Sequence, residues 1–419
     1  MILEKSWIGA NEVSYIFFYP ARDLGGVQLL FLRLARLLSG VGARVFYVDF
    51  VDGYVARRIS EDGLPITLIS YKPGELVDAP VGSILIVPLS FIGVISEIFR
   101  VKEGVKVLFW CLHPLNVPVH QVAIKIKKAL GVMAFHAFSM LSKKFYWKAK
   151  SSLQSASHAG GLYFMDSPNM DEVSQYFELP FERCFLPIFL DHESEMVGSP
   201  LDSKNKLRSV AWLGRIDRDS KFFILKKIIS DFLSLEGTFP FIVVGDGAGR
   251  EMLEECFPEA EKRVIFLGEV PNKKLDSVLS EVDVVFAMGT SCLEAAAREK
   301  VVVKVDVFYE NVPETYKYKI FSEIDGYDLG RVISGEAKFS GRKMANLFAH
   351  IESVGVLRSG RDSYEKYVSE YSVESFMRKF ESAVGRSCLD MKCTLDFKNW
   401  FDIAFYKARG LYKKDKRVI

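Results

Sequence analysis

The sequence lacks several features that define whole classes of protein. Its six cysteines are scattered and form no C-x-x-C pair, which argues against a disulfide framework and against a paired-cysteine metal site. It contains no run of about 18 apolar residues, so we expect no segment that spans a bilayer. The first residues show no basic stretch that leads into a long apolar run, so no secretory signal is expected. The expected location is therefore the cytoplasm.

A strong excess of one charge is also lacking. Lys and Arg number 55 against 53 Asp and Glu, a net charge of +2 over 419 residues. A protein that coats nucleic acid would be strongly basic. Hydrophobic residues make up 49% of the chain and aromatic residues 13%, which excludes a largely disordered protein. We therefore expect two large folded domains and no nucleic-acid partner.

Short apolar runs alternate with stretches of helical period in both halves of the chain. This alternation is typical of parallel sheets that are covered by helices on both faces. The runs lie at 13–20, 44–50, 66–70, 83–90, 106–114, 161–168, 209–215, 241–247, 264–270, 282–288 and 300–306. A polar stretch around 192–206 separates the halves as a linker. The sequence thus predicts an α/β fold of two doubly wound, Rossmann-like domains, 1–192 and 207–387, which face each other across a cleft and are followed by a basic tail at 388–419.

Glycine-rich turns after two of the strands mark candidate ligand sites. Gly25 and Gly26 open the first long helix, where the backbone can approach an anion closely, although an ordinary tight turn would look the same. In the second half, Gly245 and Asp246 lie in the segment VVGDGAG. A nicotinamide cofactor is not favoured there, because Arg250 stands where a dinucleotide fingerprint needs its last glycine.

The segment MGTSCLEAAA, residues 288–297, follows a predicted strand and should begin a helix. Gly289, Thr290 and Ser291 could place a diphosphate at the helix N-terminus, and Glu294 could accept hydrogen bonds from a ribose. Alternatively, Ser291 and Glu294 have the spacing of a capping box, which would be purely structural. The sequence leaves both interpretations open.

Cations that suit a diphosphate occur in the segment WLGRIDRDSK. Arg215 lies at a predicted strand end and Lys221 at the start of the next helix. Arginine makes forked contacts with phosphate oxygens, whereas lysine acts as a point charge. Asp217 and Asp219 in the same loop match a short D-x-D pattern that can bind a metal ion, but this pattern is common.

The ordered set of these motifs carries a family resemblance. The segments GGVQ, LGRIDRDSK, VVGDGAGREMLEE, VIFLGEVPNKKLDSVLSEVDVVFA and LEAAAREKVVV resemble those of retaining glycosyltransferases of sequence family four, which have the GT-B fold. The resemblance covers residues 13 to 385 and is strongest from 209 to 306. It implies a nucleotide-diphosphate sugar as donor substrate, no cofactor and no metal ion.

The resemblance also implies roles for individual residues. Arg215 and Lys221 correspond to the basic pair that holds the donor diphosphate and stabilises the leaving group. The other implied roles are ribose binding by Glu294, base binding by the backbone around Val270, contact with the donor phosphates by Gly25 and Gly26, and contact with the donor sugar by His113. For His113, a hydrogen-bonded structural role is the alternative.

One position departs from the family pattern. The family has a first glutamate eight positions before the second, but Phe286 stands there in this chain. In the family that acid addresses the donor sugar, so its absence leaves the identity of the sugar open. The resemblance favours retention of the anomeric configuration. A nucleotide-sugar epimerase of the same fold, or a catalytically silent scaffold that binds nucleotide sugars beside another transferase, are the alternatives.

Positive charge and aromatic residues gather in two stretches. Residues 121–150 contain seven Lys and no acid, and the tail from Cys388 contains eight Lys and Arg against four Asp. Apolar residues of the tail from Phe397 to Tyr412 follow helical spacing and leave Asp402 on the polar side. A basic amphipathic helix with aromatic residues is typical of an anionic membrane surface. The alternative is that the tail packs against the N-terminal domain.

The expected membrane-contact residues are Lys125, Lys127, Lys128, Lys143, Lys144, Trp147 and Trp400. Together these features predict a peripheral protein at the inner face of the cytoplasmic membrane. Its expected activity is the transfer of a sugar from a nucleotide-diphosphate sugar to a glycan acceptor that is polyprenyl-linked. Such a reaction would serve the assembly of cell-surface polysaccharide, for example O-antigen, lipopolysaccharide or capsule.

Overall fold

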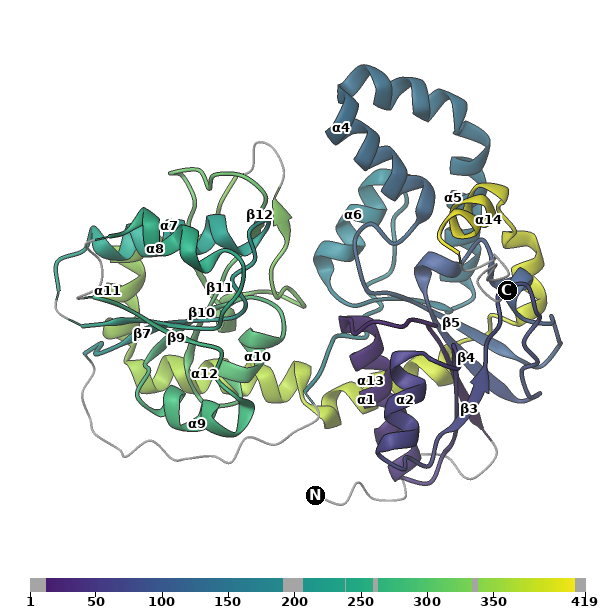
Figure 1. Ribbon diagram of the computed structural model, residues 1–419, viewed down its shortest axis with the longest axis horizontal. Helices are drawn as coiled ribbons and strands as arrows, with labels where there is room; N and C mark the ends of the chain where they lie inside the picture. Colours follow the sequence, from purple (N-terminus) through teal and green to yellow (C-terminus); the bar gives the residue numbers. More distant parts are fainter. Residues whose placement is uncertain (1–12, 191–205, 238, 259–262, 334–337, 411–419) are drawn as a thin grey trace, which may run out of the picture. The chain divides into compact units, whose positions relative to one another are not determined.

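The computed structural model describes residues 13–190, 206–237, 239–258, 263–333 and 338–410 (Figure 1). These residues form two compact units. The first contains the described residues up to Leu186 and those from Met377 onward, and the second runs from Pro187 to Phe376. Most of the linker expected at 192–206 lies outside the described residues, as do Leu411 and Tyr412.

The first unit is built on a six-stranded parallel sheet with the order β3-β2-β1-β4-β5-β6. Its strands are β1 Ser14–Phe18, β2 Arg44–Asp49, β3 Thr67–Ser70, β4 Ser83–Pro88, β5 Lys106–Cys111 and β6 Leu162–Phe164. Its helices are α1 Gly26–Gly40, α2 Tyr54–Glu61, α3 Ile95–Ile98, α4 Pro118–Leu141, α5 Lys143–His158, α6 Ser167–Phe177 and α14 Trp400–Ala408.

The second unit has a sheet of the same topology, with the order β13-β11-β10-β7-β8-β9. All its strands run parallel except β13, which is antiparallel to β11. The strands are β7 Val210–Leu213, β8 Phe241–Val244, β9 Val264–Gly268, β10 Val284–Ala287, β11 Val301–Lys304 and β13 Lys319–Ile320, with the small pair β12 Val307–Phe308 and β14 Val332–Ile333 outside the sheet. The helices are α7 Lys221–Leu233, α8 Arg250–Cys256, α9 Asn272–Ser280, α10 Thr290–Ala296, α11 Met344–Val354 and α12 Val356–Tyr371.

Alternation along the strands explains why helices cover both faces of each sheet. In β10, Val284 and Phe286 face a core formed with α7 and α11, whereas Val285 and Ala287 face a core formed with α9 and α10. Figure 1 shows the two helical layers of this unit above and below its sheet. Strands that are buried on both faces read as continuous apolar runs. All eleven strands predicted from the sequence are present.

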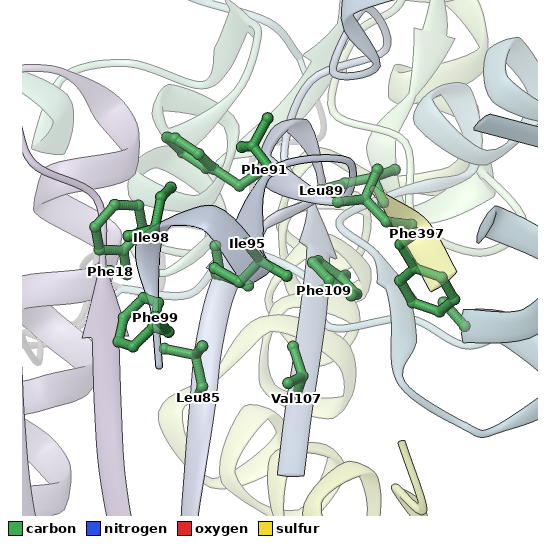
Figure 2. Packing of buried hydrophobic residues seen from close by; sticks show 14 of the residues in the cluster. Phe18, Leu85, Leu89, Phe91, Ile95, Ile98, Phe99, Val107, Phe109 and Phe397 are labelled. Carbon is green, nitrogen blue, oxygen red and sulfur yellow. The ribbon is translucent and has the colours of Figure 1, made fainter. Parts of the chain in front are cut away.

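The chain returns to the first unit through α13, Val373–Arg386. Tyr15 on β1 contacts Phe380 at a ring distance of 5.7 Å, and the Tyr163 hydroxyl donates to the carbonyl oxygen of Ala383 at 3.3 Å. Phe397 then packs beside Phe109 in the core that Figure 2 shows. The sequence analysis placed the boundary at 387, where the basic tail begins. The contacts instead assign the described residues from Met377 onward to the first unit.

The C-terminal helix α14 packs on the first unit through a face that the sequence did not predict. Ile403 and Tyr406 are buried, and the Tyr406 ring stacks on Phe91 at 4.8 Å. Trp400 is 64% exposed instead. Asp402 was expected on the polar side of this helix, and that expectation was wrong, since its side chain is fully buried against Gly93.

The Asp402 carboxyl gives the fold a predictable pH dependence. Neither of its oxygens has a hydrogen-bond partner among the described residues, and burial raises the pKa of Asp402 from 3.8 to about 8. The folded protein therefore binds this proton more tightly than the unfolded chain does. The free energy of unfolding should fall as the pH rises from about 4 to about 8, by at most about 1.4 kcal/mol per pH unit, and level off above.

Asp402→Asn removes this ionisation and keeps the shape of the side chain. We expect the variant to melt higher than the wild type at pH 8 and close to it at pH 4. Thermal melts at pH 4, 6 and 8 measure the difference. An equal offset at all three values would show that Asp402 does not titrate as its burial implies.

Candidate functional site

The topology of the second sheet places a candidate site between β7 and β10. In doubly wound sheets, ligands bind at the carboxyl ends of the strands where the strand order reverses. In this sheet the order reverses between β7 and β10. Gly214 and Arg215 follow β7, and Met288 and Gly289 follow β10. The sequence-predicted residues Arg215, Gly289, Thr290 and Ser291 thus meet at one sheet edge.

Lys221 and Ser291 converge on Gly214 at this edge. A Cβ atom at Gly214 would lie 3.7 Å from both the Nζ of Lys221 and the Oγ of Ser291. A Cβ at these distances would make ordinary contacts, but the φ of Gly214, 152°, favours glycine. Arg215 is exposed beside it. The arrangement offers an ammonium group, a hydroxyl and a guanidinium to an anion.

The surroundings of Lys221 lower the pKa of its ammonium group. Burial lowers the pKa of the Lys221 ammonium, the positive charge of Arg215 lowers it further, and Asp217 opposes the change. A half-buried cation interacts more strongly with an anion than an exposed one does, because less water screens it.

Asp217 holds the start of α7. Its Oδ1 accepts hydrogen bonds from the backbone N–H of Ser220 at 2.8 Å, from the Ser220 hydroxyl at 2.6 Å and from the backbone N–H of Lys221 at 3.0 Å. Although burial works against it, these bonds lower the pKa of Asp217. Asp217 is therefore engaged with the helix start that presents Lys221. Among the described residues, no three His, Cys, Asp or Glu side chains are grouped as metal ligands.

The glycines of the VVGDGAG segment pack two loops together. A Cβ at Gly245 would lie 2.1 Å from the carbonyl oxygen of Gly214, and one at Gly247 would lie 2.4 Å from that of Ile216. The backbone N–H of Ile216 donates to the oxygen of Asp246 at 2.9 Å. Asp246 itself forms an exposed ion pair with Arg250 at 3.1 Å. This close packing fixes the loop that carries Arg215.

Glu294 lies on α10, one turn beyond Ser291. Its Oε2 pairs with Nη1 of Arg298 at 2.8 Å, and Nε of Arg298 also contacts Asp276 on α9 at 2.5 Å. The N-cap of α10 is Gly289, and Ser291 is the second residue of the helix. The capping-box interpretation was therefore wrong, since Ser291 does not occupy the cap position.

Phe286 explains the missing first acid in structural terms. It is a fully buried residue of β10, whose ring contacts Tyr318 and Phe348. Only Met288 and Gly289 separate β10 from α10. Because position 286 lies within β10 and its side chain is part of the core formed with α7 and α11, it presents no side chain to this edge. Val270, the expected base-binding position, lies beyond the end of β9 and is half-buried.

The remaining predicted residues lie in the first unit, at the carboxyl ends of β1 and β5. Gly25 is the N-cap of α1 and Gly26 its first residue. His113 follows β5, and its Nδ1 accepts a hydrogen bond from the backbone N–H of Leu115 at 3.0 Å. In a neutral His113 the ring proton therefore resides on Nε2, which can donate to a ligand.

Sequence reasoning missed an apolar surface on α4 and its end. Gly131 breaks this helix with a φ of 83°, and Figure 1 shows the helix arching away from the sheet of its unit. Met133 is 88% exposed and Leu141 85%. We call this the α4 tip, formed by Leu130, Val132, Met133, Met140 and Leu141, each more than half exposed. The break at Gly131 destroyed the regular helical spacing that would have revealed it.

The chain was compared with known proteins. No family model matches it, and no curated protein matches it. Among solved structures, it is similar to a glycosyltransferase from Rickettsia africae, with 12% identity over 90% of this chain and 99% of that one and a TM-score of 0.52. It is also similar to Anabaena Alr3699/HepE in complex with UDP and glucose, with 13% identity, 89% and 99% coverage and a TM-score of 0.53. A third similar structure is the lipopolysaccharide outer core galactosyltransferase WaaB, with 11% identity, 89% and 99% coverage and a TM-score of 0.52. Identities this low show a shared fold alone.

Proposed function

We propose that this chain, which has the GT-B fold of the three similar structures, is a glycosyltransferase that uses a nucleotide-diphosphate sugar. The observation that carries the proposal is the convergence of Lys221 and Ser291 on Gly214 at the point where the second sheet reverses its order. Arg215 directly follows Gly214, and Glu294 lies one turn beyond Ser291 on α10. HepE was crystallised with UDP and glucose, which supports a nucleotide sugar as donor.

In this proposal the protein acts mainly on the leaving group. Breaking the anomeric C–O bond leaves negative charge on the nucleoside diphosphate. Lys221 and Arg215 stabilise that charge as it develops, because they are already oriented at the sheet edge before the reaction. Fixed cations of this kind supply what a divalent metal supplies in other sites, so we propose a metal-independent reaction. Retention of anomeric configuration follows from the family resemblance.

Glu294→Gln tests the proposed ribose contact. Glutamine still accepts the hydrogen bond of Arg298, but a neutral acceptor bonds a ribose hydroxyl about half as strongly as a carboxylate does. We expect nucleoside diphosphate affinity to fall about tenfold, which is about 1.4 kcal/mol, with little change in melting temperature. Asp276→Asn is the matched control, since it neutralises the other carboxylate that pairs with Arg298 and should leave affinity unchanged. A variant that melts far lower and binds normally would assign Glu294 to structure.

For the acceptor we propose a lipid-linked glycan, reached at a membrane surface. The α4 tip exposes apolar side chains, and the predicted lysines flank it on α4 and α5. Trp147 is 53% exposed on α5. Apolar side chains bordered by lysines fit an anionic bilayer, where the apolar groups leave water and the lysines meet lipid phosphates. Among the described residues, no helix is long and apolar enough to cross a membrane.

Helix α14 packs against α4 and α5, the helices that carry the α4 tip and the predicted lysines. Phe401 contacts Phe138 and Phe145 at ring distances of 6.0 and 5.6 Å, and Arg409 donates to Gln121 at 3.2 Å. We propose that α14 thereby holds the α4 tip in position, while Trp400 remains available to lipid. The protein would then work peripherally at the inner face of the cytoplasmic membrane, in O-antigen, lipopolysaccharide or capsule assembly.

A silent nucleotide-sugar scaffold is the second candidate, favoured by the burial of Phe286 where the family has an acid. Incubation with a panel of nucleotide sugars and polyprenyl-linked glycans decides between the candidates. Free nucleoside diphosphate with an elongated acceptor supports transfer, interconversion of the sugar indicates an epimerase, and binding without turnover indicates the scaffold.

A further inference from the structure

Four charged side chains form a cluster beside the site, which we call the 304–331 cluster. Lys304 at the end of β11 places its Nζ 2.6 Å from Oδ1 of Asp306 and 3.4 Å from Oδ1 of Asp328. Arg331 donates two hydrogen bonds to Oδ2 of Asp328, from Nε at 3.2 Å and from Nη2 at 3.0 Å. Lys304 and Asp328 are 4% and 7% exposed. Two cations and two carboxylates cancel, so the cluster adds no net charge to the site.

The cluster fixes the start of α10. The carbonyl oxygen of Leu329 accepts the backbone N–H of Gly289, the N-cap of α10, at 2.7 Å. Asp328 sets the position of this carbonyl, because its Oδ1 accepts the backbone N–H of Gly330 at 2.9 Å. Gly330 has a φ of 121°, and a Cβ there would lie 2.7 Å from the oxygen of Val305. The segment from Asp328 to Gly330 therefore lies tightly over the turn before α10.

The same cluster reaches the start of α7. The backbone N–H of Arg331 donates a hydrogen bond to Oδ1 of Asp306 at 3.1 Å. The backbone N–H of Val307 in turn donates to the carbonyl oxygen of Arg331 at 2.8 Å. The next residue, Phe308, donates its N–H to the oxygen of Ser220 at 3.4 Å. Ser220 directly precedes Lys221. A continuous set of hydrogen bonds thus joins the two helix starts that carry Ser291 and Lys221.

Cys292 shows how close these charges lie to the site. Its thiol is buried at the start of α10, and burial raises its pKa. The charges of the cluster and of Lys221 act on the same thiol. The cluster and the proposed phosphate-binding cation therefore both lie near Cys292.

We propose that Asp328 is a positioning residue of the donor site, which holds Ser291 and Lys221 at the separation that the reaction needs. The proposal rests on the proposed function for its kinetic part. Misplacing a catalytic group by about 1 Å can cost about a hundredfold in rate, whereas binding depends less on such detail. The alternative is a cluster that serves stability alone.

Asp328→Asn keeps an acceptor for Gly330 but loses the charge that orients Lys304 and Arg331. We expect hydrogen exchange to become faster in the peptide 287–293, which contains the Gly289 amide. Turnover should fall about tenfold while the dissociation constant for UDP, or for whichever nucleoside diphosphate the wild type binds, changes less than threefold. Arg331→Leu, at a side chain that is 42% exposed, should give a smaller effect in the same direction, and Arg331→Lys should recover part of it.

Asp231→Asn is the matched control, because Asp231 also joins a lysine and a tyrosine, Lys227 and Tyr318, within the second unit. It should lower the melting temperature without changing exchange in 287–293. Unchanged exchange in that peptide and wild-type turnover in the Asp328 and Arg331 variants would overturn the proposal and leave the proposed function standing. If the wild type binds no nucleotide, the proposed function is rejected instead. Hydrogen exchange in the peptide 287–293 would still show whether Asp328 positions the start of α10.

Discussion

Lys221→Ala is expected to lower turnover about a hundredfold, and Arg215→Ala at least tenfold, with the fold intact. A tenfold loss corresponds to about 1.4 kcal/mol of transition-state stabilisation, and the removal of one preorganised electrostatic contact costs about a hundredfold or more. Lys221 should matter more, since it is half-buried at Gly214 whereas Arg215 is exposed. Initial rates at saturating donor, with thermal melts of each variant, measure the effect.

Lys226→Ala is the matched control for these variants. It removes a lysine from the same helix, where its Nζ lies 5.9 Å from the ring centre of Phe222, outside the proposed site. Its turnover should equal that of the wild type. Wild-type rates in both Lys221→Ala and Arg215→Ala would reject the assigned site. Activity should also survive excess EDTA, and a loss restored by Mn²⁺ or Mg²⁺ would instead assign Asp217 and Asp219 to a metal ion.

The second large effect is expected at the α4 tip. Replacement of Met133, Met140 and Leu141 by Gln should reduce binding to anionic vesicles at least tenfold, because each buried apolar side chain contributes about 1.5–3 kcal/mol when it leaves water. Turnover of a short water-soluble acceptor should remain, and turnover of a polyprenyl-linked acceptor should drop. Vesicle flotation and the two assays measure these changes.

A control and a second set of variants sharpen this test. Val354, Leu357 and Val368 are exposed apolar residues of the second unit, and their replacement by Gln should not change flotation. Charge reversal of the predicted lysines should weaken binding most at low salt, where surface charge is least screened. Equal loss with soluble and lipid acceptors, with flotation unchanged, would contradict the membrane role.

The sequence predicted the sheets well because their signal is local. A strand that is covered on both faces, such as Val284–Ala287, must be apolar along its length, and each predicted run became a strand. Arg215 and Lys221 could also be predicted, because they lie at a strand end and at the next helix start in the segment WLGRIDRDSK, whereas the role of Gly214 became visible only from the contacts. Local patterns of this kind need no knowledge of distant contacts.

The features that escaped prediction depend on contacts between distant segments. Asp402 looks like a solvent residue by helical spacing, but Gly93, over three hundred residues earlier, leaves room for it in the core. Asp328 meets Lys304 across 24 positions, and no spacing rule links them. The α4 tip was obscured by one glycine, Gly131, which redirects the helix. The positions of these residues depend on which distant residues they pack against more than on the helix or strand propensity of the local sequence.

The most direct test of the central claim compares nucleoside diphosphates with the corresponding monophosphates. Calorimetric titration of UDP, GDP, ADP and dTDP, and of each monophosphate, against wild type and Lys221→Ala measures what the second phosphate contributes. We predict that one diphosphate binds the wild type at least tenfold more tightly than its monophosphate, and that Lys221→Ala abolishes most of this difference. Equal affinity for diphosphate and monophosphate, or no binding of any nucleotide, would contradict a diphosphate site at Gly214, Lys221 and Ser291.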